Sequence, residues 1–333
     1  MNQIKAAIIG CGGRGKEHAH GYAAAPDTQI IAVVDPLAEA AQSVAVPYTV
    51  PQVYDYHPEM YAALKPDIVS VCTWTGLHAQ QVLDSVAAGV RAIHSEKPMA
   101  PTWGEAKRMH AACEAAGVQL TFCHQRRFGA HFIKARDLIR DGAIGTVHRI
   151  EGFCSDLFDW GTHWFDMFCF YNEETPIDWV MGQVNPTGAY TVFGVYVESA
   201  GLSYVQFANG VHALLVTGRD HGGTCSNRII GSKGMIEVEV NKGPRVRMLR
   251  AGHDDWEVPN LEGIVPPKGD TVLSILDAID CLRTGRKPTL SSHNALRSTE
   301  LIFATYESSR RRARVTLPLD TEDSALHSML GVD

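Results

Sequence analysis

Residues 6–15 have the sequence AAIIGCGGRG, and this stretch decides the fold of the chain. A short apolar run ends in Gly10-x-Gly12-x-x-Gly15 and passes into a segment with helical character. In a strand–turn–helix of this type, the first glycine allows a tight turn. The second lets the backbone approach a pyrophosphate, and the third permits close packing of helix on strand. Taken alone the motif is weak, because 30 glycines are spread through the chain, so its context must decide.

The context supports a dinucleotide site. We expect a helix from Gly15 to Ala25, and then a buried parallel strand over residues 30–35, IIAVVD, which is continuously apolar and ends in a carboxylate. Asp35 lies where a dinucleotide fold places the acid that binds the adenosine ribose, about 20 residues after the last motif glycine. The phosphates would then lie on backbone N–H groups at the helix N-terminus.

The cofactor type follows from the same stretch. The Asp35 carboxylate would repel a 2′-phosphate, and Pro36 offers no N–H to bind one, so the sequence favours NAD over NADP. Arg14 complicates this interpretation, because its side chain could reach a 2′-phosphate or stack on adenine.

Strand and helix patterns keep alternating through residue 122. We expect helices over 58–64, 77–88 and 103–116, and strands over 66–72, 90–94 and 118–122. Such alternation predicts a parallel, doubly wound sheet, which binds ligands at the carboxyl ends of its strands. The residues of interest are therefore those just after strands, at 73–75, 95–98 and 124–127.

From Ile144 the pattern changes to mostly strands. These are predicted over 147–153, 180–184, 195–207, 211–217, 227–230, 234–240 and 245–249. Asn209-Gly210, between two such runs, is a strong hairpin signal. The chain should therefore be α/β, with a Rossmann domain over residues 1–124 and a second domain over 125–333 built on a large, open, mostly antiparallel sheet. We expect closing helices over about 271–313, which pack back on the first domain, and a tail after Thr316.

Lys97, in the run Ser95-Glu96-Lys97-Pro98, follows a strand at the ligand edge. A lysine in a turn usually points to water. Beside a nicotinamide ring, however, it could donate to a substrate hydroxyl and stabilise developing alkoxide charge. We also expect the Lys97–Pro98 bond to be cis, because an X–Pro amide isomerises at little cost.

Asp159 and His163, in DWGTHWFD at residues 159–166, form the second candidate site. Their spacing would stack them on one face of a helix, with Asp159 at the N-cap. His163 could take the proton from a substrate hydroxyl while Asp159 orients the imidazole. The alternatives are a capping aspartate beside a half-buried histidine, or an Asp-x-x-x-His zinc pair. Zinc needs at least a third ligand, and no Cys or His clusters nearby, so we predict no metal.

The motifs together resemble the glucose–fructose oxidoreductase / inositol dehydrogenase (Gfo/Idh/MocA) family. They are the glycine turn, the acid-ended second strand, Thr73 with His78, Glu-Lys-Pro at 96–98, Arg-Arg-Phe at 126–128 and Gly-Ala-Ile-Gly at 142–145. The resemblance implies that Lys97, Asp159 and His163 are catalytic, because relatives carry Lys, Asp and His there. Gln125 departs from the pattern, since many relatives have Asn near the nicotinamide.

The residues and the resemblance together predict two binding sets. The cofactor set is Gly10, Gly12, Gly13, Arg14, Gly15, Asp35, Thr73, Trp74, His78, Glu96, Lys97 and Gln125. The candidate substrate set is Arg126, Asp156, Trp160 and Trp164, because aromatic faces and charged groups suit hydroxyl-rich ligands.

Bulk properties exclude several other classes. The net charge of −7 argues against a nucleic-acid or anionic-membrane partner. The chain start has no signal-peptide form, and no apolar run approaches the roughly 20 residues needed to span a bilayer. Eight cysteines lack any Cys-x-x-Cys pair, which indicates buried free thiols in a reduced, cytoplasmic protein. The open sheet is expected to pair between subunits as a homodimer or homotetramer.

Three functions remain open. The first is an NAD-dependent dehydrogenase that oxidises a secondary hydroxyl of a sugar, polyol or inositol. The second is a redox-neutral sugar enzyme that retains NAD and cleaves a glycosidic bond or passes the hydride to a second sugar. The third is a non-catalytic NAD-binding regulator, which the presence of Lys97, Asp159 and His163 disfavours.

Overall fold

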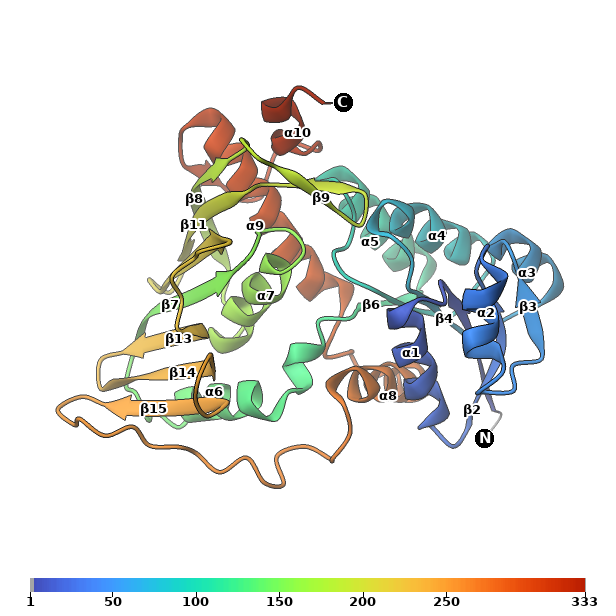
Figure 1. Ribbon diagram of the computed structural model, residues 1–333, viewed down its shortest axis with the longest axis horizontal. Helices are drawn as coiled ribbons and strands as arrows, with labels where there is room; N and C mark the ends of the chain where they lie inside the picture. The colour runs from blue at the N-terminus through green and yellow to red at the C-terminus, as the bar shows by residue number, and fades with distance from the viewer. Residues whose placement is uncertain (1–2, 333) are drawn as a thin grey trace. The chain divides into compact units, whose positions relative to one another are not determined.

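The computed structural model describes residues 3–332, and its contacts divide the chain into two compact units. Unit 1 contains Met1–Gln125 and Lys268–Leu296, and unit 2 contains Arg126–Pro267 and Arg297–Asp333. Each unit is built on one large sheet (Figure 1). No helix among residues 3–332 combines the length and the apolar character needed to cross a membrane.

Unit 1 carries a six-stranded parallel sheet in the order β3-β2-β1-β4-β5-β6. The strands are β1 (Ile4–Ile9), β2 (Thr28–Val34), β3 (Gln52–Tyr54), β4 (Ile68–Val71), β5 (Ala92–Ser95) and β6 (Gln119–Phe122). The helices are α1 (Gly13–Ala23), α2 (Ala38–Ala45), α3 (His57–Ala63), α4 (Thr75–Ala87), α5 (Trp103–Ala116) and α8 (Asp270–Thr284). This order, with its reversal between β1 and β4, confirms the predicted doubly wound sheet.

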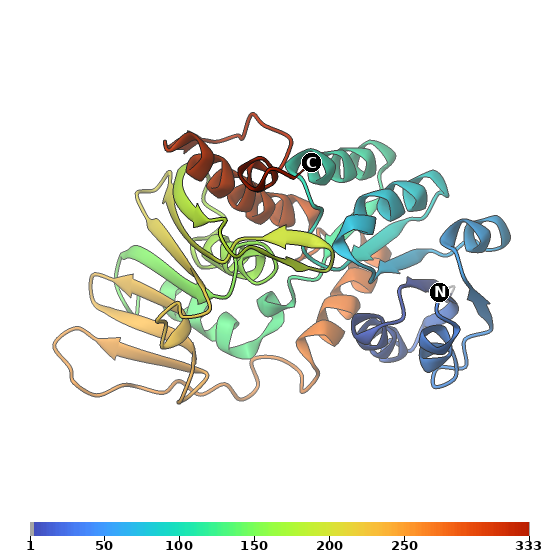
Figure 2. The same cartoon turned by 45° about the horizontal axis from the view of Figure 1, so that its top comes forward.

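Helix α8 belongs to unit 1 although it lies about 150 residues beyond β6 in the chain. It packs against α1, and both views show the two helices side by side (Figures 1 and 2). The contact is close because α1 carries Gly21, where a Cβ would lie 2.7 Å from the Ile275 side chain. Burial of such apolar surface is the main force that holds α8 on the sheet domain.

Unit 2 carries an eight-stranded sheet in the order β15-β14-β13-β7-β12-β11-β8-β16. The strands are β7 (Val147–Cys154), β8 (Ile177–Asn185), β11 (Ala200–Phe207), β12 (His212–Gly218), β13 (Cys225–Gly231), β14 (Gly234–Val240), β15 (Val246–Arg250) and β16 (Val315–Thr316). A separate hairpin pairs β9 (Tyr190–Val192) with β10 (Val195–Val197). Within this sheet, β7 and β12 are the only parallel neighbours among the described strands, so the mostly antiparallel second sheet is confirmed.

The strand register separates the two faces of this sheet. Ser203, Leu215 and Gly152 lie in one row, and helices α7 (Gly161–Tyr171) and α9 (Ser292–Arg311) cover that face. The alternate row contains Tyr204 and Leu214, which are partly exposed. The sheet therefore has one covered face and one open face.

Three local predictions need correction. The stretch 195–207 is not one strand but β10 and β11, separated at the buried Glu198. Strands β3, β9 and β16 are too short to show periodicity, and helices α2 and α6 (Ala130–Arg140) were not predicted. The segment after Thr316 is not a loose tail, because it forms α10 (Ala325–Leu330) and buries Leu326 completely.

Candidate functional site

The glycine turn of unit 1 has the geometry of a pyrophosphate cradle. Gly10 leaves β1 with φ +92°, a conformation that side chains rarely adopt. A Cβ on Gly15 would lie 2.1 Å from the Gly10 carbonyl oxygen, so only glycine allows α1 to start this close to β1. Apart from the adjoining residues and the backbone of α1, no described atom lies within 4 Å of a Cβ built on Gly12 or Gly13, so the backbone there is open to a ligand. These residues fit a dinucleotide.

Asp35 follows β2 and is tied to this turn. One carboxylate oxygen accepts a hydrogen bond from the Cys11 backbone N–H at 2.8 Å, and the other accepts one from Leu37 N–H at 2.9 Å. The carboxylate is thus held beside the start of α1, at the carboxyl end of β2. This is the position at which the sequence placed the ribose-binding acid.

The Arg14 side chain is bonded to Glu96 and Glu17, and no contact among the described residues joins it to Asp35. Its Nε lies 2.6 Å from Glu96 Oε1, and its Nη2 lies 3.3 Å from Cys123 Sγ. Glu96 follows β5, whereas Asp35 follows β2, and strands β1 and β4 lie between them. The strand that precedes Glu96 is therefore three strands along the sheet from the strand that precedes Asp35.

Glu96 and Lys97 lie directly after β5, at the ligand edge. The Lys97 backbone N–H donates to Glu96 Oε2 at 3.3 Å, and the Lys97–Pro98 bond is cis, as expected. Glu96 is only 4% exposed. Burial alone would raise the pKa of its carboxyl, but the hydrogen bond to His18 and the charge of Arg14 outweigh burial and hold the pKa well below its usual range.

The turns after β4 and β5 are joined by His78. One ring nitrogen lies 2.9 Å from the Pro98 carbonyl oxygen and the other 3.1 Å from the Thr73 carbonyl oxygen. The Thr73 hydroxyl donates to Gln81 at 2.7 Å, and Trp74 is 65% exposed. Thr73 and His78 therefore shape the ligand edge, while Trp74 is available to a ligand.

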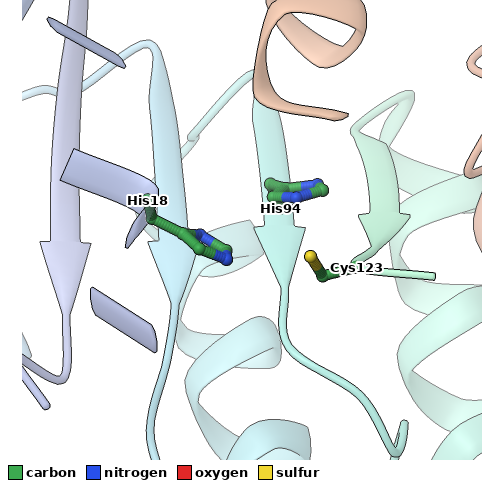
Figure 3. A group of neighbouring side chains, drawn as sticks. All are labelled: His18, His94 and Cys123. Atoms are coloured by element: carbon green, nitrogen blue, oxygen red, sulfur yellow. The ribbon is translucent and has the colours of Figure 1, made fainter. Parts of the chain in front are cut away.

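A buried cluster that the sequence did not reveal lies beneath this edge. One ligand-type atom from each of His18, His94 and Cys123 lies within 4.8 Å of the other two (Figure 3). Hydrogen bonds engage both ring nitrogens of each histidine: His18 contacts Ser70 and Glu96, and His94 contacts Thr121 and Ser274. The Arg14 cation also contacts the thiol. This arrangement favours a hydrogen-bond network over a metal site.

In unit 2, helix α7 begins at Gly161, so Asp159 precedes the helix and is not its N-cap. Asp156 holds this turn instead: its Oδ1 accepts hydrogen bonds from Asp159 N–H at 2.5 Å and Trp160 N–H at 3.3 Å. Gly161 is needed there, because a Cβ on it would lie 2.9 Å from the Asp156 carbonyl oxygen. The prediction of one helical face for Asp159 and His163 is therefore wrong, although α7 does position His163.

The side chains around this turn divide into buried and accessible ones. Asp156 is 1% exposed and its carboxylate is engaged within the turn, so its contacts give it a structural role. Trp160 is 46% exposed, whereas His163 and Trp164 are buried. The Arg126 guanidinium lies 4.6 Å from the Trp164 ring centroid and 5.6 Å from that of Trp160. These three side chains therefore group at the start of α7.

Residues 4–124 match the GFO_IDH_MocA model, described as an oxidoreductase family with an NAD-binding Rossmann fold. D-apiose dehydrogenase of Paraburkholderia graminis is 26% identical over 361 aligned positions, which cover 98% of this chain and 94% of that protein. Inositol 2-dehydrogenase of Rhizobium meliloti is 28% identical over 261 positions, which cover 71% and 76%.

Solved structures share the fold along almost the whole chain. The WlbA dehydrogenase from Bordetella pertussis, in complex with NADH and UDP-GlcNAcA, has a TM-score of 0.78 at 23% identity and covers 96% of this chain and 99% of its own. A levoglucosan dehydrogenase, in complex with NADH and levoglucosan, has a TM-score of 0.81 at 18% identity and covers 96% and 100%.

Proposed function

Because this chain belongs to the Gfo/Idh/MocA oxidoreductase family, we propose that it oxidises a secondary hydroxyl of a sugar, polyol or inositol with NAD, or reduces the matching ketone. The D-apiose and inositol dehydrogenases among its relatives support this substrate class. The observation that carries the proposal is the placement of Lys97 directly after β5, in the same sheet edge as the glycine turn.

The residues of unit 1 suit the binding half of this reaction. Gly12, Gly13 and the start of α1 would hold the pyrophosphate, and Asp35 would accept the ribose hydroxyls. NAD, when bound, supplies the hydride acceptor. Lys97 would donate to the substrate oxygen and stabilise the negative charge that develops there.

The residues of unit 2 suit the proton transfer. His163 would take the hydroxyl proton at a ring nitrogen, and Asp159 would stabilise the imidazolium that forms. Arg126 and Trp160 would bind the hydroxyl-rich ligand, since one supplies N–H donors and the other an exposed aromatic face.

The test is NADH formation with a panel of polyols and sugars, for the wild type and for His163→Asn. We expect the variant to lose about 10²- to 10⁴-fold in kcat, the usual contribution of a general base. His20→Asn, an exposed histidine on α1, is the matched control. Unchanged turnover in His163→Asn would refute the assigned role.

A redox-neutral reaction with retained NAD is the alternative outcome of the same experiment. It predicts that dinucleotide survives gel filtration and that no net NADH is released while the sugar is consumed. Rapid exchange with added NAD would exclude it.

We further propose that the open face of the unit 2 sheet pairs with a second copy as a homodimer or homotetramer. Met181 is 50% and Leu202 43% exposed there, and Trp179 stacks on Tyr204 with ring centroids 5.6 Å apart. Leu202→Glu should therefore lower the mass measured by sedimentation, whereas Val258→Glu, at an exposed residue outside the strands, should not. A monomeric wild type would refute this pairing.

A further inference from the structure

Glu198, between β10 and β11, is completely buried, yet no step proposed above uses it. Its Oε1 accepts hydrogen bonds from Leu157 N–H at 2.7 Å and from the Thr217 hydroxyl at 3.0 Å. Its Oε2 accepts one from the Tyr306 hydroxyl at 2.8 Å. The carboxylate therefore connects β12, α9 and the turn before α7.

The hydrogen bond to Leu157 N–H is the important one, because Leu157 lies in the turn that carries Asp159. Asp156 fixes the same turn from its other side, through its bonds to the N–H groups of Asp159 and Trp160. Two buried carboxylates thus hold five consecutive residues, 156–160, and set where α7 begins. In unit 2 this turn and the first turn of α7 present both Asp159 and His163.

We propose that Glu198 is a positioning residue, which holds the 156–160 turn in its catalytic conformation only while the Glu198–Asp156 pair retains a proton. This inference rests on the proposed function, because it assumes that Asp159 and His163 carry out the proton transfer. A displacement of about 1 Å in such groups can cost up to about 100-fold in rate, so a small movement of this turn would control the rate.

The charges around the pair explain why a proton is retained. Among the described residues, neither Glu198 nor Asp156 forms an ion pair. Burial first, and then the charge of Asp156, raise the pKa of Glu198 to about 7, and burial also raises the pKa of Asp156. The titratable and charged groups around the pair are Cys154 on β7, Asp159 in the turn, Tyr190 on β9, Tyr306 on α9 and Arg126, whose charge acts on Cys154. The first four cannot supply a positive charge, and Arg126 is not among the groups that shift the pKa of Glu198 or Asp156.

The neutral form of Glu198 keeps all three contacts. Its carbonyl oxygen still accepts from Leu157 and Thr217, and its O–H can donate to the Tyr306 oxygen. Ionisation instead places a second negative charge beside Asp156 in a buried site. The turn should therefore be tight below pH 7 and should loosen as the pH rises above it.

Glu198→Gln tests this, because the amide reproduces the neutral acid and cannot ionise. The matched control is Glu237→Gln, a 2%-exposed glutamate on the open face of the same sheet, paired with Arg228 and Arg247. Two readouts are followed between pH 6 and 9. The first is kcat with saturating NAD. The second is the fluorescence of Trp160, obtained by subtracting the emission of the same protein that also carries Trp160→Phe.

We expect the wild type and Glu237→Gln to lose kcat above pH 7, by about tenfold relative to Glu198→Gln at pH 9. The Trp160 emission should change over the same pH range, and Glu198→Gln should show neither change. Superimposed pH curves for wild type and Glu198→Gln would overturn the inference.

The two proposals fail in different ways. If no sugar or polyol in the panel gave NADH with the wild type, the proposed function would fail, whereas the Trp160 titration would still report on the turn without any turnover. If His163→Asn were inactive but Glu198→Gln matched the wild type in both readouts, only the positioning role would be refuted.

Discussion

Two buried glutamates lie next to the residues proposed for catalysis, and they are in opposite electrostatic states. Glu96 in unit 1 accepts the backbone N–H of Lys97, and Glu198 in unit 2 accepts that of Leu157, two residues before Asp159. Glu96 is 4% exposed and Glu198 is completely buried. The pKa of Glu96 lies well below its usual range, whereas that of Glu198 is raised to about 7.

The difference comes from the partners and not from burial, which raises the pKa of both carboxyls. Glu96 lies 2.6 Å from the Arg14 guanidinium and 3.1 Å from His18, and these outweigh burial. Glu198 has only neutral donors and a neighbouring carboxylate. Buried carboxylates can therefore serve as a fixed charge in one unit and as a titrating group in the other.

The largest effect should come from substitution of Lys97, whose backbone N–H donates to the ionised carboxylate of Glu96. Lys97→Met should lower kcat by about 10²- to 10⁴-fold, because the ammonium is lost while the turn and its Glu96 contact remain. Thermal unfolding should change little. Lys65→Met, at an exposed lysine of the same unit, is the control. A kcat within about twofold of the wild type would remove Lys97 from the mechanism.

Replacement by glutamine should lower the free energy of unfolding by different amounts at Glu96 and at Glu198. Glu96→Gln should destabilise the fold by about 2 kcal/mol, because it removes the buried counter-charge of Arg14 and leaves only the exposed partner Glu17. Breaking a fully buried pair costs about 3–5 kcal/mol, and Arg14 is partly exposed. Glu198→Gln should cost less than about 1 kcal/mol, because the amide keeps the contacts. Urea unfolding at pH 7 measures both. Equal losses would mean that the comparison between the two sites is wrong.

The pH dependence of stability should have opposite signs at the two sites. A raised folded-state pKa means that the contribution of Glu198 is full below about pH 4.5 and is lost as the pH rises through about 7. As the pH rises from 5 to 8, the free energy of unfolding of Glu198→Gln should therefore increase by about 2 kcal/mol relative to that of the wild type. The contribution of Glu96 is instead present above about pH 4.5 and is lost in acid. A flat difference for Glu198→Gln across this range in urea titrations would contradict the assignment.

The smallest effect concerns a third carboxylate, Asp35, which is partly exposed and bonded to backbone N–H groups only. Asp35→Ser should raise the kcat/KM ratio of NADP to NAD by about tenfold, because one negative charge no longer opposes the 2′-phosphate. Asp27→Ser, at an exposed aspartate before β2, is the control. No change in the ratio would place the cofactor discrimination elsewhere.

Much of unit 1 could be predicted because its signals are local. The glycine turn, the apolar run ending at Asp35 and the strand–turn segments around residues 73 and 97 each encode one strand end, and parallel strands bring those ends to one edge. The longer strands of unit 2 were also visible as periodic runs, but the short strands β9 and β16, like β3 in unit 1, were not. His18, in a mostly polar helix, and Glu198, between two short strands, were missed because no motif marks either residue as buried.

The sequence by itself determined the two sheet types and the glycine turn after β1, because periodicity and turn chemistry act over a few residues. Only the tertiary structure decided which side chains meet. Arg14 turns to Glu96, 82 residues away, and Glu198 reaches Leu157, 41 residues away. Such partners set the charge state of each carboxylate, since a buried group takes its pKa from its neighbours in space and not from its neighbours in sequence.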